Sequence, residues 1–157
     1  MQPSKRCKNF SLSAFFCLLL SSCTGAAGTL GVHDSKLSPC PARPNCVSSD
    51  SAAAEHRVEP FHLAVPAAEG WQMARTLVAE LPRTTIITQG PDYLHAECRS
   101  AVFGFVDDLE LHLRPDKNTI AVRSAARLGY SDLGVNRKRI EDLRSKLTGR
   151  GAIDLSP

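Results

Sequence analysis

Alternation of apolar and charged side chains between residues 93 and 127 constrains the fold of this chain more than any other feature. A period of two is typical of β-strands, whose successive side chains point to opposite faces. Short clusters of turn-forming residues interrupt the alternation, so the strands should run antiparallel as a meander. The predicted strands are residues 84–89, 93–100, 103–114 and 119–127.

Two helical patterns flank this meander. Apolar residues recur at helical spacing from Trp71 to Leu81, and Pro82 ends the run. A second stripe contains Ile140 and Leu147, with Asn136 expected as its N-cap and Gly149 as its C-terminal cap. A further strand is expected at residues 57–64, although Pro60 interrupts it.

These elements predict the α+β class: an antiparallel meander of four to five strands with two helices packed on one face. A single domain should span residues 37–149, with a short tail at 150–157. Alternation places apolar side chains such as Leu94 and Leu109 on the helix side. The opposite face is then dense in charge. Its expected members are Tyr93, His95, Glu97, Arg99, Asp108, Glu110, His112, Arg114, Arg123 and Arg127.

The first 22 residues are typical of an export signal. Lys5, Arg6 and Lys8 precede an apolar run over residues 10–20, which is too short to span a membrane. The sequence Leu20-Ser21-Ser22-Cys23 resembles the lipobox of bacterial lipoproteins, in which the cysteine is acylated and becomes the new N-terminus. An ordinary secretory peptide with a chance cysteine is the alternative. Residues 23–36, rich in small side chains, are expected to form a flexible tether.

Removing this signal also removes the apparent basicity of the chain. The signal carries three of the 19 basic residues and no acidic residue, so 19 − 3 = 16 basic side chains remain against 16 acidic ones. A nucleic-acid partner is therefore not expected. We expect a lipid-anchored protein of the bacterial cell envelope. Because Thr24 rather than Asp follows the cysteine, the expected location is the outer membrane, facing the periplasm.

Cys40 and Cys46 enclose five residues, two of them proline, and should form a disulfide in an oxidising compartment. A redox site and a metal site are the alternatives. The metal reading lacks further ligands at suitable spacing, so neither a metal nor a cofactor is expected. Cys98, on the apolar side of its strand, is expected to be a buried filler.

The charged face offers the first candidate site. Asp108 and Glu110 share one side of a strand, about 7 Å apart, where two carboxylates could act as acid and base. Glu97 lies on the same face, and Arg99, Arg123 and Arg127 could clamp an anionic substrate there. The competing interpretation is a network of cross-strand ion pairs that fixes the register and needs no substrate.

The second candidate site lies at the start of the last helix. Free amides at a helix N-terminus attract anions, and Arg137 stands beside them. Tyr130 and Asp132 precede this helix, and Asn136 is its expected cap. Capping and loop closure would explain the same residues without a ligand.

Three long motifs resemble one protein family. They are residues 40–49 (CPARPNCVSS), 103–108 (FGFVDD) and 123–137 (RSAARLGYSDLGVNR). In this order they are similar to the domain-of-unknown-function family numbered 1499, from about Leu37 to Leu147. The resemblance implies no activity. Three hypotheses therefore remain. The first is a non-catalytic envelope lipoprotein that binds an anionic small molecule or an envelope protein, and the second is a lipid-anchored hydrolase or transferase using Asp108 and Glu110 with Arg99 and Arg123. The third is thiol redox chemistry at Cys40 or Cys46.

Overall fold

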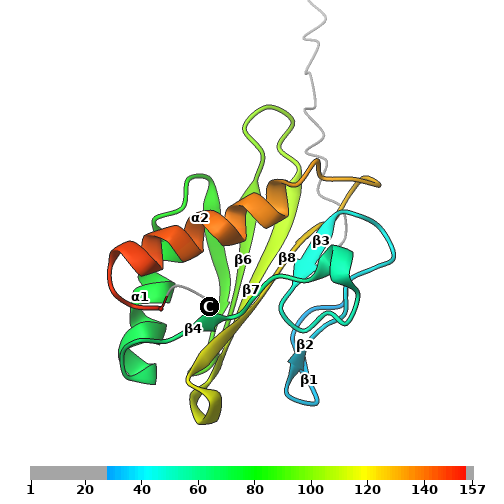
Figure 1. Ribbon diagram of the computed structural model, residues 1–157. Helices are drawn as coiled ribbons and strands as arrows, with labels where there is room; N and C mark the ends of the chain where they lie inside the picture. The colour runs from blue at the N-terminus through cyan, green and yellow to red at the C-terminus, as the bar shows by residue number, and fades with distance from the viewer. Residues whose placement is uncertain (1–27, 155–157) are drawn as a thin grey trace, which may run out of the picture.

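The computed structural model describes residues 28–154 and has the expected α+β class (Figure 1). Its main sheet has the strand order β3-β8-β7-β6-β5, and every pairing in it is antiparallel. β4 also pairs with β8. The strands are β3 (Cys46–Ser48), β4 (Phe61–His62), β5 (Thr84–Gln89), β6 (Tyr93–Arg99), β7 (Val106–Arg114) and β8 (Thr119–Ala126).

The four strands of the meander agree with the alternation in the sequence. Their ends differ at one turn, because residues 103–105 belong to the loop between β6 and β7 and not to β7. The turn before β8 contains the short helix η2 (Pro115–Lys117), and Asn118 adopts the left-handed conformation that closes it.

The expected strand over residues 57–64 is wrong for most of its length. Only Phe61–His62 is a strand, since Pro60 has no amide hydrogen to donate to a ladder. Two short strands, β3 and β4, therefore pair with the outer edge of β8, and Val47 of β3 lies opposite Ser124 of β8. The short helix η1 (Ala54–His56) lies between β3 and β4 along the chain.

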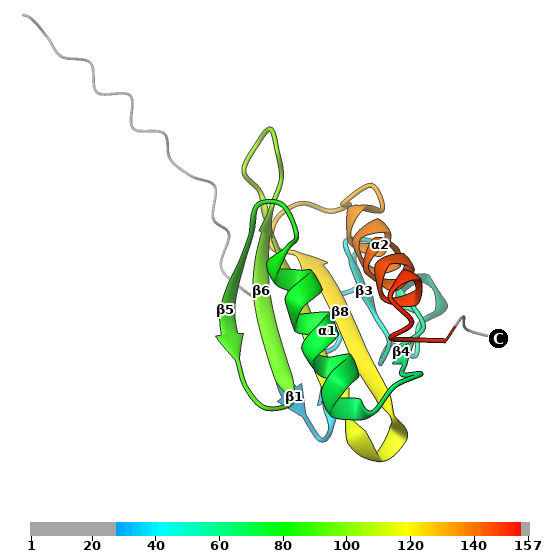
Figure 2. The same cartoon turned by 90° about the vertical axis from the view of Figure 1, so that its left-hand side faces the viewer.

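Both helices contribute to the same hydrophobic core. α1 (Ala67–Ala79) buries Trp71 and Leu77, and α2 (Val135–Gly149) buries Ile140, Leu143 and Leu147. The same core contains apolar side chains of the strands, such as Leu94 and Leu109, and Figure 2 shows α1 in front of the sheet with α2 beside it. The opposite side of the sheet is left to the charged residues.

The ends of α2 differ from the sequence-based expectation. Asp132, and not Asn136, caps the helix: its carboxylate accepts hydrogen bonds from the amides of Gly134 and Asn136, at 3.0 and 2.9 Å. At the other end Gly149 is still helical. The left-handed glycine that follows the helix is Gly151, with a φ of 70°.

The charged face is covered by the N-terminal part of the described chain, residues 28–38, which we call the N-terminal cover. It contains a small hairpin of β1 (Val32–His33) and β2 (Lys36–Leu37). The Gly31 amide donates to Glu110 Oε1 at 2.7 Å, and the Leu37 side chain is buried. Residues 28–36, expected to belong to a flexible tether, instead include strand β1, and the Gly31 amide bonds to the Glu110 side chain on the sheet.

The signal peptide, Cys23 and the start of the tether lie outside the described residues. Within residues 28–154, neither helix is long and apolar enough to cross a membrane.

Candidate functional site

Strand register brings the charged side chains together in rows across the sheet. Glu97 on β6 lies opposite Asp108 on β7, which lies opposite Ala125 on β8. In the next row His95 faces Glu110, which faces Arg123. Because Ala125 is small, the first row leaves space above β8.

Arg127 connects the carboxylates of the first row. Its guanidinium donates to both oxygens of Asp108, at 3.0 and 2.7 Å, and to Glu97 Oε1 at 2.7 Å. His95 Nε2 lies 2.7 Å from the same carboxylate of Asp108. Arg99 reaches only Glu97, at 3.0 Å, and its side chain is 40% exposed. Arg99 therefore stands at the rim of the cluster.

Asp108 is held in its ionised form. Burial alone would raise the pKa of this carboxyl, but hydrogen bonds from His95 and Arg127 bring the pKa below its usual range. The same bond to Asp108 raises the pKa of Arg127, so this guanidinium stays charged. Asp108 is consequently a poor proton donor at neutral pH.

Glu110 and Arg123 form the most deeply buried pair of the face. Arg123 Nη1 donates to Glu110 Oε2 at 2.6 Å, and the two residues are 4% and 0% exposed. The other oxygen of Glu110 accepts from Tyr93 Oη at 2.8 Å and from Gly31. Burial, and then the charge of Glu110, raise the pKa of the Tyr93 hydroxyl, which remains protonated as a donor.

A third pair joins the face to a loop. Arg114 donates two hydrogen bonds to the carboxylate of Asp50, at 2.8 and 2.6 Å. Burial, together with the charge of Arg114, lowers the pKa of the neighbouring His112. The network of ion pairs expected from the sequence therefore exists, but it is buried under the N-terminal cover and not exposed.

The second candidate site does not have the arrangement expected of an anion site. Asp132 occupies amides at the start of α2, which leaves them unavailable to an anion. Asn136 is fully buried and receives a hydrogen bond from Ser124 Oγ at 2.6 Å. Arg137 donates to backbone carbonyls of Glu55 and Arg57, and Tyr130 is 71% exposed. Asn136 and Arg137 therefore attach α2 to neighbouring segments, and Tyr130 does not take part.

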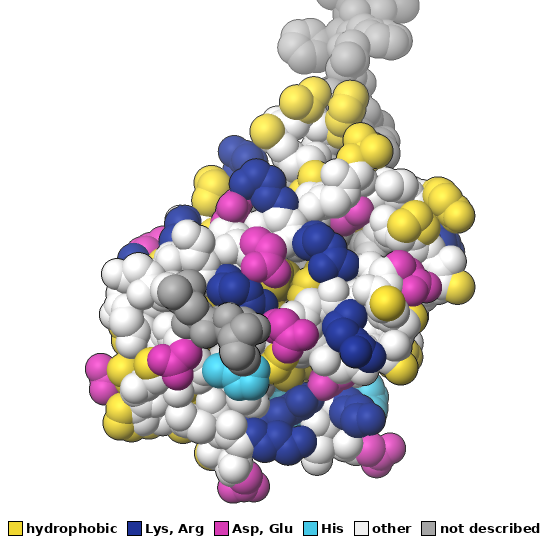
Figure 3. Space-filling view, in the orientation of Figure 1, with side chains coloured by type: hydrophobic (Ala, Val, Ile, Leu, Met, Phe, Trp, Pro, Cys, Tyr) yellow, Lys and Arg dark blue, Asp and Glu magenta, His cyan; other side chains and the backbone are white. Residues whose placement is uncertain are grey.

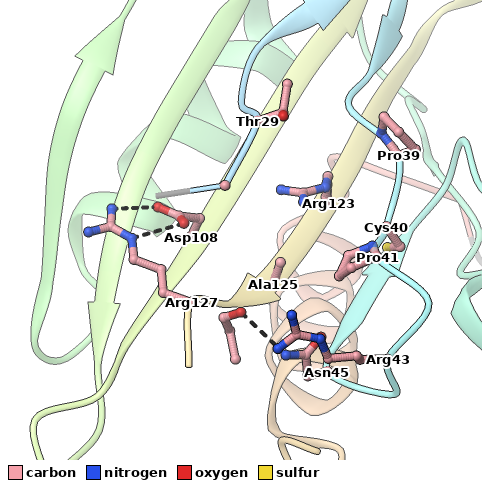
Figure 4. A pocket seen from close by; sticks show the side chains of 12 residues that line it. Thr29, Pro39, Cys40, Pro41, Arg43, Asn45, Asp108, Arg123, Ala125 and Arg127 are labelled. Carbon is pink, nitrogen blue, oxygen red and sulfur yellow. Dashed lines mark hydrogen bonds and ion pairs between the residues drawn. The ribbon is translucent and has the colours of Figure 1, made fainter. Parts of the chain in front are cut away.

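A cavity of about 380 Å³ opens where the N-terminal cover meets the charged face (Figure 4). The sheet contributes Asp108, Arg123 and Arg127 to its walls. The opposite wall consists of Gly28 and Thr29 and of the loop from Pro39 to Asn45. Three of the residues expected at a site thus lie together around one cavity.

Two residues that line this cavity each have a buried polar atom without a hydrogen-bond partner within residues 28–154. One is Nε of Arg123, a donor, and the other is Oδ1 of Asn45, an acceptor. Asn45 is 2% exposed, and its Nδ2 donates to Gly129 O at 2.9 Å, which fixes the orientation of its amide. Buried polar atoms without a partner are uncommon, and they point to a missing water or ligand.

The Cys40–Cys46 disulfide holds the outer wall. The S–S bond closes the loop that carries Arg43 and Asn45, as the sequence predicts. The Asn45 carbonyl accepts from the amide of Ala126, which ties this loop to the end of β8. Arg43 is exposed at the rim and forms no ion pair with the described residues. Cys98 is free and buried on the other side of the sheet, as expected.

Sequence reasoning does not identify Arg43 and Asn45 as site residues, and it places His95 on the charged face without a partner. The sequence predicts a disulfide for the loop that contains Arg43 and Asn45, but no pattern there marks either side chain as a binding group. His95 shares the charged face by alternation alone. Its contact with Asp108 depends on strand register, which the sequence does not give.

The arrangement of these side chains can be compared with what acid–base catalysis and metal binding require. Asp108 and Glu110 each form an ion pair with an arginine. Within residues 28–154 no cluster of three or more His, Cys, Asp or Glu side chains is arranged to hold a metal ion. The arrangement is suited to holding an anion by guanidinium groups.

Comparison with known proteins gives one match. A family model described as "Protein of unknown function (DUF1499)" matches residues 36–147. No curated protein and no solved structure is significantly similar to the chain.

Proposed function

This chain belongs to the DUF1499 family, and because the family description assigns no activity, we propose its function from its own site. The protein is a lipid-anchored component of the bacterial cell envelope that binds a small anion, without chemical conversion, in the cavity beside Arg123. The observation that carries the proposal is the buried Nε of Arg123, which has no partner within the described residues.

The chemistry of the cavity defines the class of ligand. Arg123 Nε and the guanidinium of Arg43 favour a carboxylate or a phosphate, the groups that arginine binds best. Asn45 Oδ1 requires a donor, such as a hydroxyl or an amide N–H, on the same ligand. A volume of about 380 Å³ lies within the range of small-molecule sites.

The envelope location is supported by the sequence and by one structural feature. Residues 1–22 have the pattern of a signal peptide, and Cys23 ends a lipobox-like sequence. The Cys40–Cys46 disulfide is typical of proteins outside the cytoplasm. Thr24 after the cysteine favours the outer membrane, with the domain in the periplasm.

The alternative function, a hydrolase or transferase using Asp108 and Glu110 with Arg99 and Arg123, has less support. An acid catalyst needs a carboxyl that is protonated near neutral pH, and the pKa of Asp108 is lowered. Glu110 is fully buried in bonds to Arg123, Tyr93 and Gly31. Arg99 does not line the cavity.

Isothermal titration calorimetry on the full chain, processed by its host and held in detergent, tests binding. Two probes are matched: glycerol 3-phosphate has hydroxyl donors for Asn45, whereas inorganic phosphate lacks the glycerol. We expect saturable binding, tighter for glycerol 3-phosphate. Arg43→Ala should weaken it by about tenfold or more, because a charged hydrogen bond is lost.

Lys117→Ala is the matched control, because it removes the same charge from the exposed η2 turn, which does not line the cavity. Equal effects of the two substitutions, or no binding of either probe, would contradict the proposal. Release of inorganic phosphate from glycerol 3-phosphate would favour the hydrolase.

A further inference from the structure

Exposed hydrophobic side chains are concentrated at one end of the molecule. Of the nine large ones in residues 28–154, all but Val32 and Ile87 belong to the β6–β7 loop, to the segment joining β8 to α2, or to the first residue of α2. We call six of them the apolar tip: Val102, Phe103, Phe105, Leu128, Leu133 and Val135. Figure 3 shows hydrophobic side chains gathered at the top of the molecule, over the β6–β7 loop.

The two segments of the apolar tip meet in one shallow hollow. Phe105, Leu128 and Val135, which come from both segments, line one shallow hollow. The Phe103 and Phe105 rings lie 5.6 Å apart between centroids. Phe103 is 72% exposed and Leu133 is 94% exposed, so the domain itself does not bury them. An exposed apolar surface of this kind marks an interaction site.

The N-terminal cover begins at the same end. Gly28 and Thr29 line the same cavity as Ala126 and Arg127, which lie at the end of β8 from which the second tip segment departs. Only residues 24–27 separate Gly28 from Cys23. Since a chain spans at most about 3.5 Å per residue, Gly28 can lie no more than about 20 Å from Cys23. A lipid on Cys23 would hold the apolar tip close to the bilayer.

Basic side chains stand next to the tip. Arg83, Arg99 and Lys138 line a second hollow together with Ala101 of the β6–β7 loop and Val135 of the tip. A basic rim around an apolar surface complements a membrane that contains anionic lipids. Tyr130, 71% exposed, adds an aromatic ring of the kind that favours the membrane interface.

We infer that the apolar tip, flanked by Arg83, Arg99 and Lys138, docks onto the surface of a lipid bilayer and inserts Phe103 and Leu133 among the lipids. This inference rests on the proposed lipid anchor, which would supply one attachment while the tip supplies the second. Docking by the tip also fixes the orientation of the domain on the bilayer: the apolar tip lies in the membrane interface, and the β1–β2 hairpin points away from the membrane.

Fluorescence quenching on the full, host-processed chain tests the docking. The chain is reconstituted in vesicles of phosphatidylethanolamine and phosphatidylglycerol, with and without brominated acyl chains. Phe103→Trp reports on the tip, and Val32→Trp is its control on the hairpin at the opposite end (Figure 1). Trp71, the single native tryptophan, is buried in the core, and its emission is subtracted with the unsubstituted chain.

We expect brominated lipid to quench Phe103→Trp at least about twofold more than Val32→Trp. Adding Val102→Asp and Leu133→Asp, both at exposed positions, should abolish this difference while the chain stays attached to the vesicles. Equal quenching of the two tryptophans would overturn the inference. So would a shift in Phe103→Trp emission that depends on protein concentration without vesicles, because a second copy would then cover the tip.

Mass spectrometry of the N-terminal peptide separates this inference from the proposed anchor. A lipidated Cys23 with an unquenched Phe103→Trp refutes the docking and leaves the anchor intact. An unlipidated chain whose Phe103→Trp is quenched refutes the anchor and supports the docking.

Discussion

The Arg123 guanidinium donates to Glu110 at 2.6 Å, and this ion pair is almost completely removed from solvent by the N-terminal cover. Gly31 of the cover donates to the same carboxylate. Glu110 therefore binds the sheet to the cover, while Arg123 lines the cavity and its Nε has no hydrogen-bond partner within the described residues. The ion pair of Arg123 and Glu110 therefore contributes to the stability of the fold and also includes a residue of the proposed binding site.

Glu110→Gln should destabilise the domain strongly. The substitution leaves the Arg123 charge buried without its carboxylate, which costs about 3–5 kcal/mol. Urea unfolding followed by circular dichroism measures the change. Asp142→Asn is the control, because it breaks an exposed pair with Lys138 and should cost less than about 1 kcal/mol. A loss for Glu110→Gln no larger than that of the control would contradict the buried pair.

Stability should fall when the pH is lowered below about 4, because the pKa of Asp108 in the folded state is lower than its ordinary value of 3.8. The stabilisation by this carboxylate is present above its unfolded pKa and is lost as the pH falls through the folded pKa. Asp108→Asn should be less stable at neutral pH and should lose less on acidification. Unfolding curves between about pH 5 and pH 3 check both effects. Equal acid losses in the two proteins would be inconsistent with an ionised Asp108.

Asn136→Ser distinguishes a cap from a buried connector. Serine is a good N-cap, so the substitution would be nearly neutral if Asn136 capped α2. Because Asn136 is buried and bonds Ser124 and the carbonyl of Asn45, we expect a loss of about 2–3 kcal/mol instead. Asp132→Ala, which removes the observed cap, should cost about 1 kcal/mol. Thermal or urea unfolding measures the loss of stability in each variant. If Asn136→Ser caused no loss, Asn136 would be the cap of α2 after all.

Removing the disulfide should weaken both the fold and ligand binding. Replacing Cys40 and Cys46 by serine reopens a short loop, and the chain-entropy estimate gives about 2 kcal/mol of lost stability. Arg43 and Asn45 lie within this loop, so affinity for glycerol 3-phosphate should fall by at least about tenfold. Calorimetry at a temperature where the variant remains folded measures the affinity. Unchanged binding would show that the loop is not part of the site.

The meander could be predicted because its information is local. Alternation along Tyr93–Arg99 and Val106–Arg114 assigns each side chain to a face, and turn residues separate the strands. The helix that follows Pro66 is equally local, since its apolar spacing matches one helical face. The α+β class follows from these elements.

The remaining features depend on contacts between distant segments. β3 has only three residues, and its partner on β8 lies more than seventy positions away, so no periodicity marks it. The small and polar residues 28–36 resemble a linker until Gly31 meets Glu110. Asn136 and Asp132 are both capping residues by type, and only the packing of α2 on β8 decides which is buried.

The candidate site was predictable in its residue types but not in its partners. Alternation placed Asp108, Glu110 and Arg123 on one face, whereas the pairing of Arg127 with Asp108 depends on how the chain turns after β8. The cavity could not be predicted from the sequence, because its outer wall consists of the disulfide loop and the N-terminal cover, which lie far along the chain from the strands that they face.

The Nε–Hε resonance of Arg123 tests the central claim most directly. In a ¹⁵N spectrum of arginine side chains, titration with glycerol 3-phosphate should shift this resonance saturably and leave the Nε–Hε resonance of Arg114, which lies outside the cavity, unchanged. That result would place an anion beside Arg123. An Arg123 resonance that stays unchanged, or that moves together with all other arginines, would contradict an anion site in this cavity.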